Sequence, residues 1–273
     1  MPLQASKFSS LSRWRLLDGR WVFATPNEVK VLTVREPQNH GRAPLQTSIP
    51  AVASTRDTNN LLQGIIGAYL SSEPPIPPRS KKEYIAMLES NYVIVAAIEE
   101  VLQTAIHSAS RVNKTHLVSF LSEIYQSEQG HSSLIEDDLE ALGVSQVGTH
   151  TESNLAGAFR VRDLLRQLAS SKDPQAILGV GYLLETNALA INQLFLDELL
   201  RVVPEAVTAI SFLQTHSGVG VEADHVADLL EFISVEPIVS RLEIISACEQ
   251  AAQIVMESAP LKLSSQSSAS PFG

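Results

Sequence analysis

The sequence predicts an all-α protein, a bundle of about seven helices preceded by one short helix and an irregular N-terminal extension. Beyond residue 60, apolar residues recur at helical spacing in long segments, and strand-like patterns are absent after residue 35. Proline and glycine divide this part into segments of helical length. We expect helices at about 59–71, 81–108, 113–141, 154–170, 174–202, 204–215, 221–233 and 236–258.

The helix boundaries rest on local stop and start signals. The proline-rich segment 74–78 ends the first helix, because proline cannot continue a helix. Ser80 followed by Glu83 has the spacing of a capping box, which predicts the start of the second helix. Gly143 is expected to end the third helix, and Gly218 is expected to end the sixth.

Charge and composition divide the chain into three parts. Residues 1–60 carry 8 Lys and Arg against 4 Asp and Glu, whereas residues 61–273 carry 12 against 26. We interpret 1–60 as a mostly irregular extension with a possible hairpin at 21–34. Residues 61–258 form the helical domain, and the serine-rich residues 259–273 form a disordered tail.

The overall composition excludes several classes of function. A net charge of −10 disfavours nonspecific nucleic-acid binding. The single cysteine, Cys248, excludes an internal disulfide and a multi-thiolate metal site, which fits a cytoplasmic protein. No apolar run is long enough to predict a membrane span.

Two Glu-x-x-His pairs predict metal binding. Glu128 stands three residues before His131, and Glu222 stands three residues before His225, each within a predicted helix. Side chains at i and i+3 share a helical face, so each pair could bind one metal ion. The alternatives stay open at this point, since His131 and His225 could instead lie on the protein surface.

A third candidate ligand, Glu185, interrupts the apolar segment 176–200. No Lys or Arg occurs between Lys172 and Arg201, so no neighbour in sequence can offset a buried carboxylate there. A bound cation would do so, although a solvated stripe shared with Asn187 is the alternative. Tyr125 and Tyr182 each precede a candidate glutamate by three residues and could hydrogen-bond to the ligands.

Glu and His ligands without cysteine suit iron or, alternatively, manganese, with positions open to O₂. The expected apolar lining of such a site consists of Ile94, Ile98, Leu121, Leu184 and Phe212. Other apolar cores would have a similar composition, so the lining leaves the substrate open.

Together, the Glu128–His131 pair, 141-ALG-143, 178-LGVGYLLE-185 and the histidine-containing stretch 216–225 resemble the heme-oxygenase-like diiron oxidases and oxygenases, over about residues 80–258. The resemblance implies a seven-helix core, two non-heme iron ions and oxidation of a small organic substrate by O₂. Carried over by motif, it implies six ligands: Glu128, His131, Glu185, His216, Glu222 and His225.

The final motif departs from the family's usual His-x3-Asp-x2-His. Here it is 216-HSGVGVEADH-225, with two additional residues and Glu222 at the aspartate position. Either the glycine-containing turn restores His216 to the site, or this ligand is lost. His216 also ends a predicted helix, where the helix dipole alone favours histidine.

Three other functions remain as alternatives. A ferritin-like carboxylate diiron protein would use Glu99 or Glu100 with Glu185 and would not need His216. A metal-free enzyme on the same scaffold would use glutamate and histidine for acid–base catalysis. A non-catalytic helical interaction protein could use the basic residues 1–60 for docking. The diiron interpretation also implies O₂ and a small-molecule substrate as partners, with an external electron donor and a homodimer possible.

Overall fold

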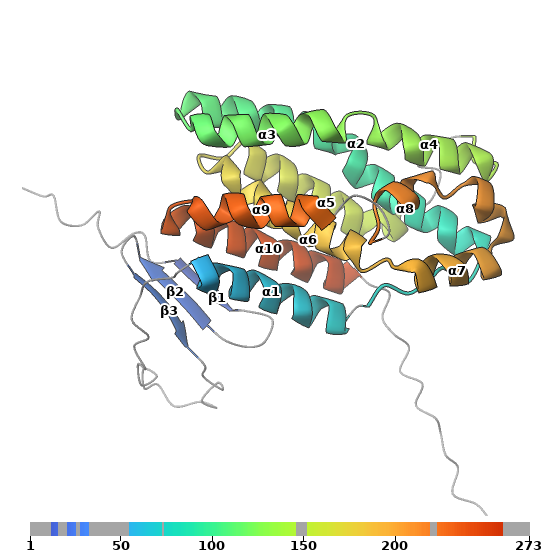
Figure 1. Cartoon of the computed structure of the whole chain (residues 1–273), viewed down its shortest axis with the longest axis horizontal. Coiled ribbons are helices and arrows are strands. Elements are labelled where there is room, and N and C mark those ends of the chain that lie inside the picture. Colours follow the sequence, from blue (N-terminus) through green and yellow to red (C-terminus); the bar gives the residue numbers. More distant parts are fainter. Residues whose placement is uncertain are drawn as a thin grey trace, which may run out of the picture.

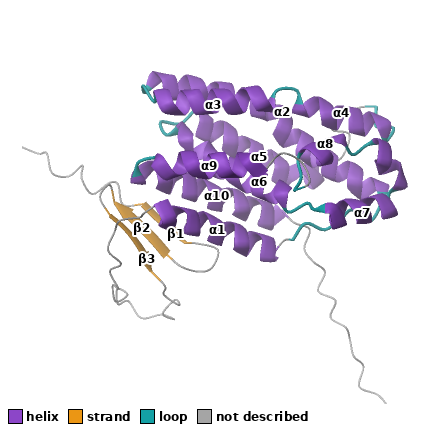
Figure 2. Ribbon diagram, viewed as in Figure 1, coloured by secondary structure: helices purple, strands orange, loops and turns teal. Residues whose placement is uncertain are grey.

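A computed structural model describes residues 12–15, 21–25, 28–32, 55–72, 74–145, 152–218 and 223–258. The described residues between 55 and 258 form a helical bundle, and the described strands belong to the N-terminal region (Figures 1 and 2). The long helices are α1 Thr55–Ser72, α2 Lys81–Arg111, α3 Thr115–Glu128, α4 His131–Ala141, α5 Glu152–Ala169, α6 Ile177–Leu189, α7 Gln193–Val202, α9 Ala223–Val235 and α10 Ile238–Ser258. The short helical turns are η2 Pro174–Ala176, η3 Pro204–Thr208 and α8 Ser211–Thr215.

The N-terminal strands form an antiparallel sheet in the order β1-β2-β3. β2 Trp21–Thr25 and β3 Glu28–Leu32 form the hairpin expected at 21–34, with Thr25 opposite Glu28 at the turn. β1 Ser12–Arg15, which the sequence did not predict, pairs with β2. After the hairpin, the expected N-terminal extension is described again only from Thr55, where α1 begins, and the expected tail at 259–273 lies outside the described residues.

The start of α2 partly follows the predicted capping box. The Ser80 hydroxyl accepts the backbone N–H of Glu83 at 3.2 Å, as expected of an N-cap. The Glu83 carboxylate, however, accepts hydrogen bonds from the backbone and side chain of Arg79 instead of the backbone of Ser80. The start of the helix was therefore predicted correctly. The second hydrogen bond of the capping box differs, because its donor is the backbone N–H of Arg79 and not that of Ser80.

Three of the predicted helices are interrupted. The helix expected at 113–141 is divided into α3 and α4 by Gly130, which has a φ of +83° that suits glycine. The helix expected at 174–202 is divided into η2, α6 and α7, because the Asn192 side chain accepts the N–H of Phe195 and starts a new helix. The helix expected at 204–215 is replaced by η3 and α8.

Two hydrophobic cores lie along the bundle. One joins α1, α3, α5, α6, α9, α10 and the C-terminal half of α2, and it includes the fully buried Leu121. The other joins the N-terminal half of α2 with α4, α7, η3 and α8, and it includes the fully buried Leu139. α2 is long enough to contribute to both, and α3 and α4 follow one another beside it (Figure 1). The break between α3 and α4 therefore falls where the two cores meet.

Helices α6 and α10 approach very closely at Gly179. A Cβ atom at this position would lie 1.9 Å from the backbone oxygen of Ile244, so a larger residue would force the helices apart. None of the helices in the described part of the chain combines the length and apolar character needed to cross a bilayer.

Candidate metal centre

Five of the six predicted ligands come together, and Glu128 is common to two possible metal-binding groups. One group consists of Glu128, His131 and His216, and the other of Glu128, Glu185 and His225. Within each group, one ligand-type atom per residue lies within 4.8 Å of the others. The sixth predicted ligand, Glu222, lies outside the described residues.

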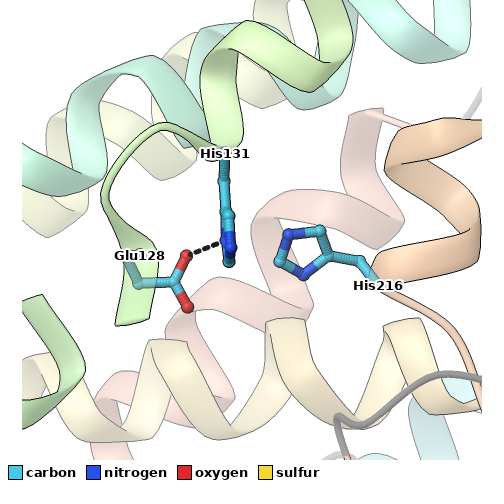
Figure 3. Close-up of side chains that lie close together, drawn as sticks. All are labelled: Glu128, His131 and His216. Carbon is cyan, nitrogen blue, oxygen red and sulfur yellow. Dashed lines mark hydrogen bonds and ion pairs between the residues drawn. The ribbon is translucent and has the colours of Figure 1, made fainter. Parts of the chain in front are cut away.

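Glu128 and His131 meet across a turn and not along one helical face. Glu128 is the last residue of α3, His131 is the first residue of α4, and Gly130 provides the left-handed backbone between them. Nδ1 of His131 lies 3.1 Å from Oε2 of Glu128, as Figure 3 shows. The predicted i,i+3 helical geometry is therefore wrong, although the two side chains do meet.

A hydrogen bond from helix α2 holds the turn between Glu128 and His131 in place. The backbone N–H of Gly130 donates to the carboxylate of Glu99 at 3.2 Å, and Glu100 forms an ion pair with Arg166 at 2.7 Å. Neither Glu99 nor Glu100 lines the cavity. The ferritin-like ligand scheme, which required one of these two glutamates, therefore has no support in the geometry.

The glycine-containing turn brings His216 to the first group. His216 follows α8, is 9% exposed, and its ring lies 4.5 Å from that of His131 in a T-shaped arrangement (Figure 3). Two residues later, the backbone N–H of Gly218 donates to the carbonyl of Ile191 at 2.9 Å. A Cβ atom on Gly218 would lie 2.6 Å from the carbonyl oxygen of Leu189. The altered spacing of the motif is thus compatible with His216 facing the site.

Asp138 anchors the helix that leads to His216. The residue is 1% exposed, and its carboxylate accepts the backbone N–H groups of Ser211 at 3.0 Å and Phe212 at 2.9 Å, at the start of α8. Burial raises the pKa of Asp138, and the two backbone hydrogen bonds oppose this increase. The sequence analysis did not identify Asp138 as a buried residue.

A sequence signal for Asp138 did exist. Ile135, Asp138, Leu139 and Leu142 follow the i, i+3, i+4, i+7 pattern of a buried helical face, and all four are buried. A charged residue within such a pattern indicates a specific partner. The partner itself, the backbone at residues 211–212, could not be identified from spacing.

The second group joins α6 and α9 to the end of α3. Glu185 is half-buried on α6, and His225 is half-buried in the first turn of α9. The solvated-stripe alternative for Glu185 is disfavoured, because this side chain is half-buried and lines a cavity with His225 and Glu128.

The two tyrosines suggested as neighbours of the ligands lie elsewhere. The Tyr125 hydroxyl accepts a hydrogen bond from Gln103 at 2.6 Å. Tyr182 is buried in the core near Cys248, and burial raises the pKa of its phenol. Neither tyrosine lines the cavity. The geometry therefore does not support a role for them in orienting the ligands.

A cavity of about 360 Å³ lies between the two cores and adjoins both ligand groups. Its volume is within the range of small-molecule binding sites. Four of the five residues expected to line it do so, and Leu121 instead belongs to the core. Its apolar lining residues are Ile94, Val95, Ile98, Val101, Leu102, Phe120, Ile124, Leu165, Ile177, Leu178, Leu184, Ala188, Ile191, Phe212, Leu213 and Leu229.

The residues present fit a pair of metal ions of the iron or manganese type. Each group combines carboxylate oxygen with imidazole nitrogen, and no thiolate is nearby. Glu128 is the residue common to both groups and would supply carboxylate oxygen to each. The sequence prediction that iron binds here stays a prediction.

Comparison with solved structures identifies the fold. A domain of unknown function from Shewanella denitrificans OS217, with a crystal structure at 2.30 Å resolution, matches with a TM-score of 0.56 and 13% sequence identity. The match covers 76% of this chain and 91% of that chain, and the domain is described as having a heme oxygenase-like fold. This chain has a heme oxygenase-like fold. At this identity the likeness concerns the fold alone.

No protein-family model matches the sequence, and a search of curated proteins finds no significant match. For this heme oxygenase-like chain, any function must therefore be argued from the site.

Proposed function

We propose that this chain is a non-heme diiron oxidase or oxygenase that uses O₂ to oxidise a small organic substrate. The observation that carries the proposal is the position of Glu128, whose carboxylate belongs to both possible metal-binding groups. A carboxylate shared by two groups is the arrangement expected where two metal ions lie close together. The iron ions, when bound, would supply the reducing equivalents and the coordination positions that O₂ activation requires.

The remaining residues have distinct parts in this proposal. His131 and His216 would complete one ion's ligands, whereas Glu185 and His225 would complete those of the other. The three histidines are neutral ligands, so the carboxylates offset the charge of the ions. The apolar cavity beside them would hold the substrate and limit access of water to the site.

Iron loading tests the proposal directly. The chain would be loaded anaerobically with Fe(II), desalted, analysed for iron and then exposed to O₂ in an oxygen electrode with an absorbance record. We expect about two irons per chain and uptake of O₂ that depends on iron. A folded chain that retains no iron would contradict the proposal. Loading with Mn(II) in parallel would determine which of the two metals the site prefers.

The hydrogen bond between His131 and Glu128 favours one second candidate, a metal-free acid–base enzyme. A carboxylate that orients an imidazole is a common arrangement for proton transfer. Under this alternative, the chain would bind no iron and the two residues would act as one proton-transfer pair. The same iron analysis therefore separates the two candidates.

A further inference from the structure

Two acidic side chains outside the ligand groups line the cavity, and their charge limits which ligands the cavity can bind. Two carboxylates that belong to neither ligand group, Glu123 on α3 and Asp228 on α9, line the cavity with their side chains exposed. Within the described part of the chain, neither makes an ion pair or a side-chain hydrogen bond. Both therefore remain available to a ligand at the solvent side of the cavity.

Positive charge is missing from the same lining. None of the described residues that line the cavity is Lys or Arg, and its neutral polar members are Asn91, Ser127 and Asn187. Residues 61–273 carry 12 Lys and Arg against 26 Asp and Glu, so the surrounding field is also negative. A cationic ligand would be attracted to the opening, and an anionic ligand would be repelled from it.

Three classes of aliphatic ligand can be compared. An alkanoate would place its carboxylate among like charges, with only the metal itself as a cationic partner. An alkanol would bury its chain equally well without gaining an ion pair. An alkylammonium ion would bury its chain against the apolar lining and pair its head group with Asp228 and Glu123. The third class satisfies both the apolar interior and the acidic opening.

We infer that the cavity binds a primary aliphatic amine, with the carbon chain directed inward and the ammonium group held by Asp228 and Glu123. This inference rests on the proposed function in one respect, because it takes the cavity beside the metal ligands as the substrate site. It adds the class of the substrate and the two residues that recognise its head group.

The test compares octylamine, octanoate and octan-1-ol as probes. Each would be titrated calorimetrically into the full chain, loaded with Fe(II) and kept anaerobic so that no turnover occurs, at neutral pH. Octylamine is expected to bind several-fold more tightly than octan-1-ol, and octanoate more weakly than either. Octanoate binding that equals or exceeds octylamine binding would overturn the inference, as would the absence of octylamine binding.

Substitutions test whether Asp228 and Glu123 cause the expected preference for octylamine. Asp228→Asn and Glu123→Gln are each expected to weaken octylamine binding by about two- to five-fold, as for exposed ion pairs. The double variant should also bind octanoate more tightly than the wild type. Glu231→Gln is the matched control, because Glu231 is an exposed carboxylate on the same helix as Asp228 but does not line the cavity. Equal effects of the control and Asp228→Asn would overturn the inference.

A third variant tests whether the probe enters the cavity. Gly181 lines the cavity, and a Cβ atom there would meet nothing within 4 Å, so the larger side chain of Gly181→Val should occupy part of the cavity. It is expected to weaken octylamine binding at least ten-fold with unchanged iron content. Unchanged binding would show that octylamine lies elsewhere and would contradict the inference.

Iron analysis of the same samples separates this inference from the proposed function. Two irons per chain without a preference for octylamine would overturn the substrate class alone. A preference for octylamine in a chain that retains no iron would overturn the diiron proposal and leave the cavity assignment standing.

Discussion

The buried carboxylate of Asp138 accepts the backbone N–H of Phe212 at 2.9 Å, and thereby joins two segments that are 74 residues apart in sequence. Asp138 lies on the helix that begins with His131, and Phe212 lies on the short helix that leads to His216. One hydrogen-bonded contact thus sets the relative position of two candidate ligands. The accompanying bond to Ser211 strengthens the same connection.

Replacement of Asp138 should therefore affect the site as well as stability. Asp138→Ala would leave two backbone N–H groups without their acceptor, at a cost of about 1–3 kcal/mol in the free energy of unfolding. Displacement of His216 should also weaken one of the two metal sites by about 10–100-fold. Urea denaturation and metal titration would measure the two effects. Asp137→Asn, at an exposed neighbouring position, is the control and should change neither.

The pH dependence of stability should reveal the environment of Asp138. Burial raises its pKa in the folded state, so the folded chain holds this proton to a higher pH than the unfolded chain does. The contribution of Asp138 is then fully present below the unfolded pKa of about 3.9 and falls as pH rises through the folded pKa. The difference in unfolding free energy between wild type and Asp138→Asn should accordingly fall with pH and then level off. A difference that rises with pH would mean that the backbone hydrogen bonds outweigh burial.

Two glycines on α6 should respond oppositely to the same change. Gly179→Ala would bring a Cβ atom to 1.9 Å from the backbone oxygen of Ile244, and overpacking of this kind costs about 1–3 kcal/mol or more. Gly181→Ala meets nothing within 4 Å and replaces a poor helix former, so it should stabilise the chain by up to about 1 kcal/mol. Thermal and urea denaturation of both variants would test the close approach of α6 and α10. Equal effects would contradict it.

Gly218 should be required for the position of His216. Gly218→Ala would place a Cβ atom 2.6 Å from the carbonyl oxygen of Leu189, and the turn would have to move away from Ile191. We expect the site that contains His216 to lose metal affinity by about ten-fold or more, with the bundle intact by circular dichroism. Gly67→Ala, in open space on α1, is the matched control. Retention of full affinity at both sites would show that this turn does not position His216.

The sequence predicted the fold class correctly, because helical periodicity and the absence of strand patterns extend over most of the chain. It could not predict the break at Gly130, since glycine is compatible with a helix interior at a modest cost and only tertiary packing decided the turn. Glu128 and His131 were still paired correctly, because a tight turn also brings residues three apart into contact. Glu185 was found because its charge stood out against an apolar segment.

The features of the site that could not be predicted depend on contacts between residues far apart in sequence. Glu99 was a candidate ligand of the ferritin-like alternative, and spacing could not show that its carboxylate instead accepts a hydrogen bond from the Gly130 backbone. The partners of Asp138 are backbone groups, which every residue carries, so no residue type marked them. In the turn after His216, the backbone N–H of Gly218 donates to the carbonyl of Ile191, and spacing alone could not identify this acceptor.

Iron stoichiometry of single-ligand variants tests the central claim most directly. Glu128 belongs to both candidate groups, whereas Glu185 and His131 each belong to one. After anaerobic Fe(II) loading and desalting, we expect about two irons in the wild type, about one in Glu185→Ala or His131→Ala, and nearly none in Glu128→Ala. A Glu128→Ala chain that is folded and still retains two irons would contradict the account.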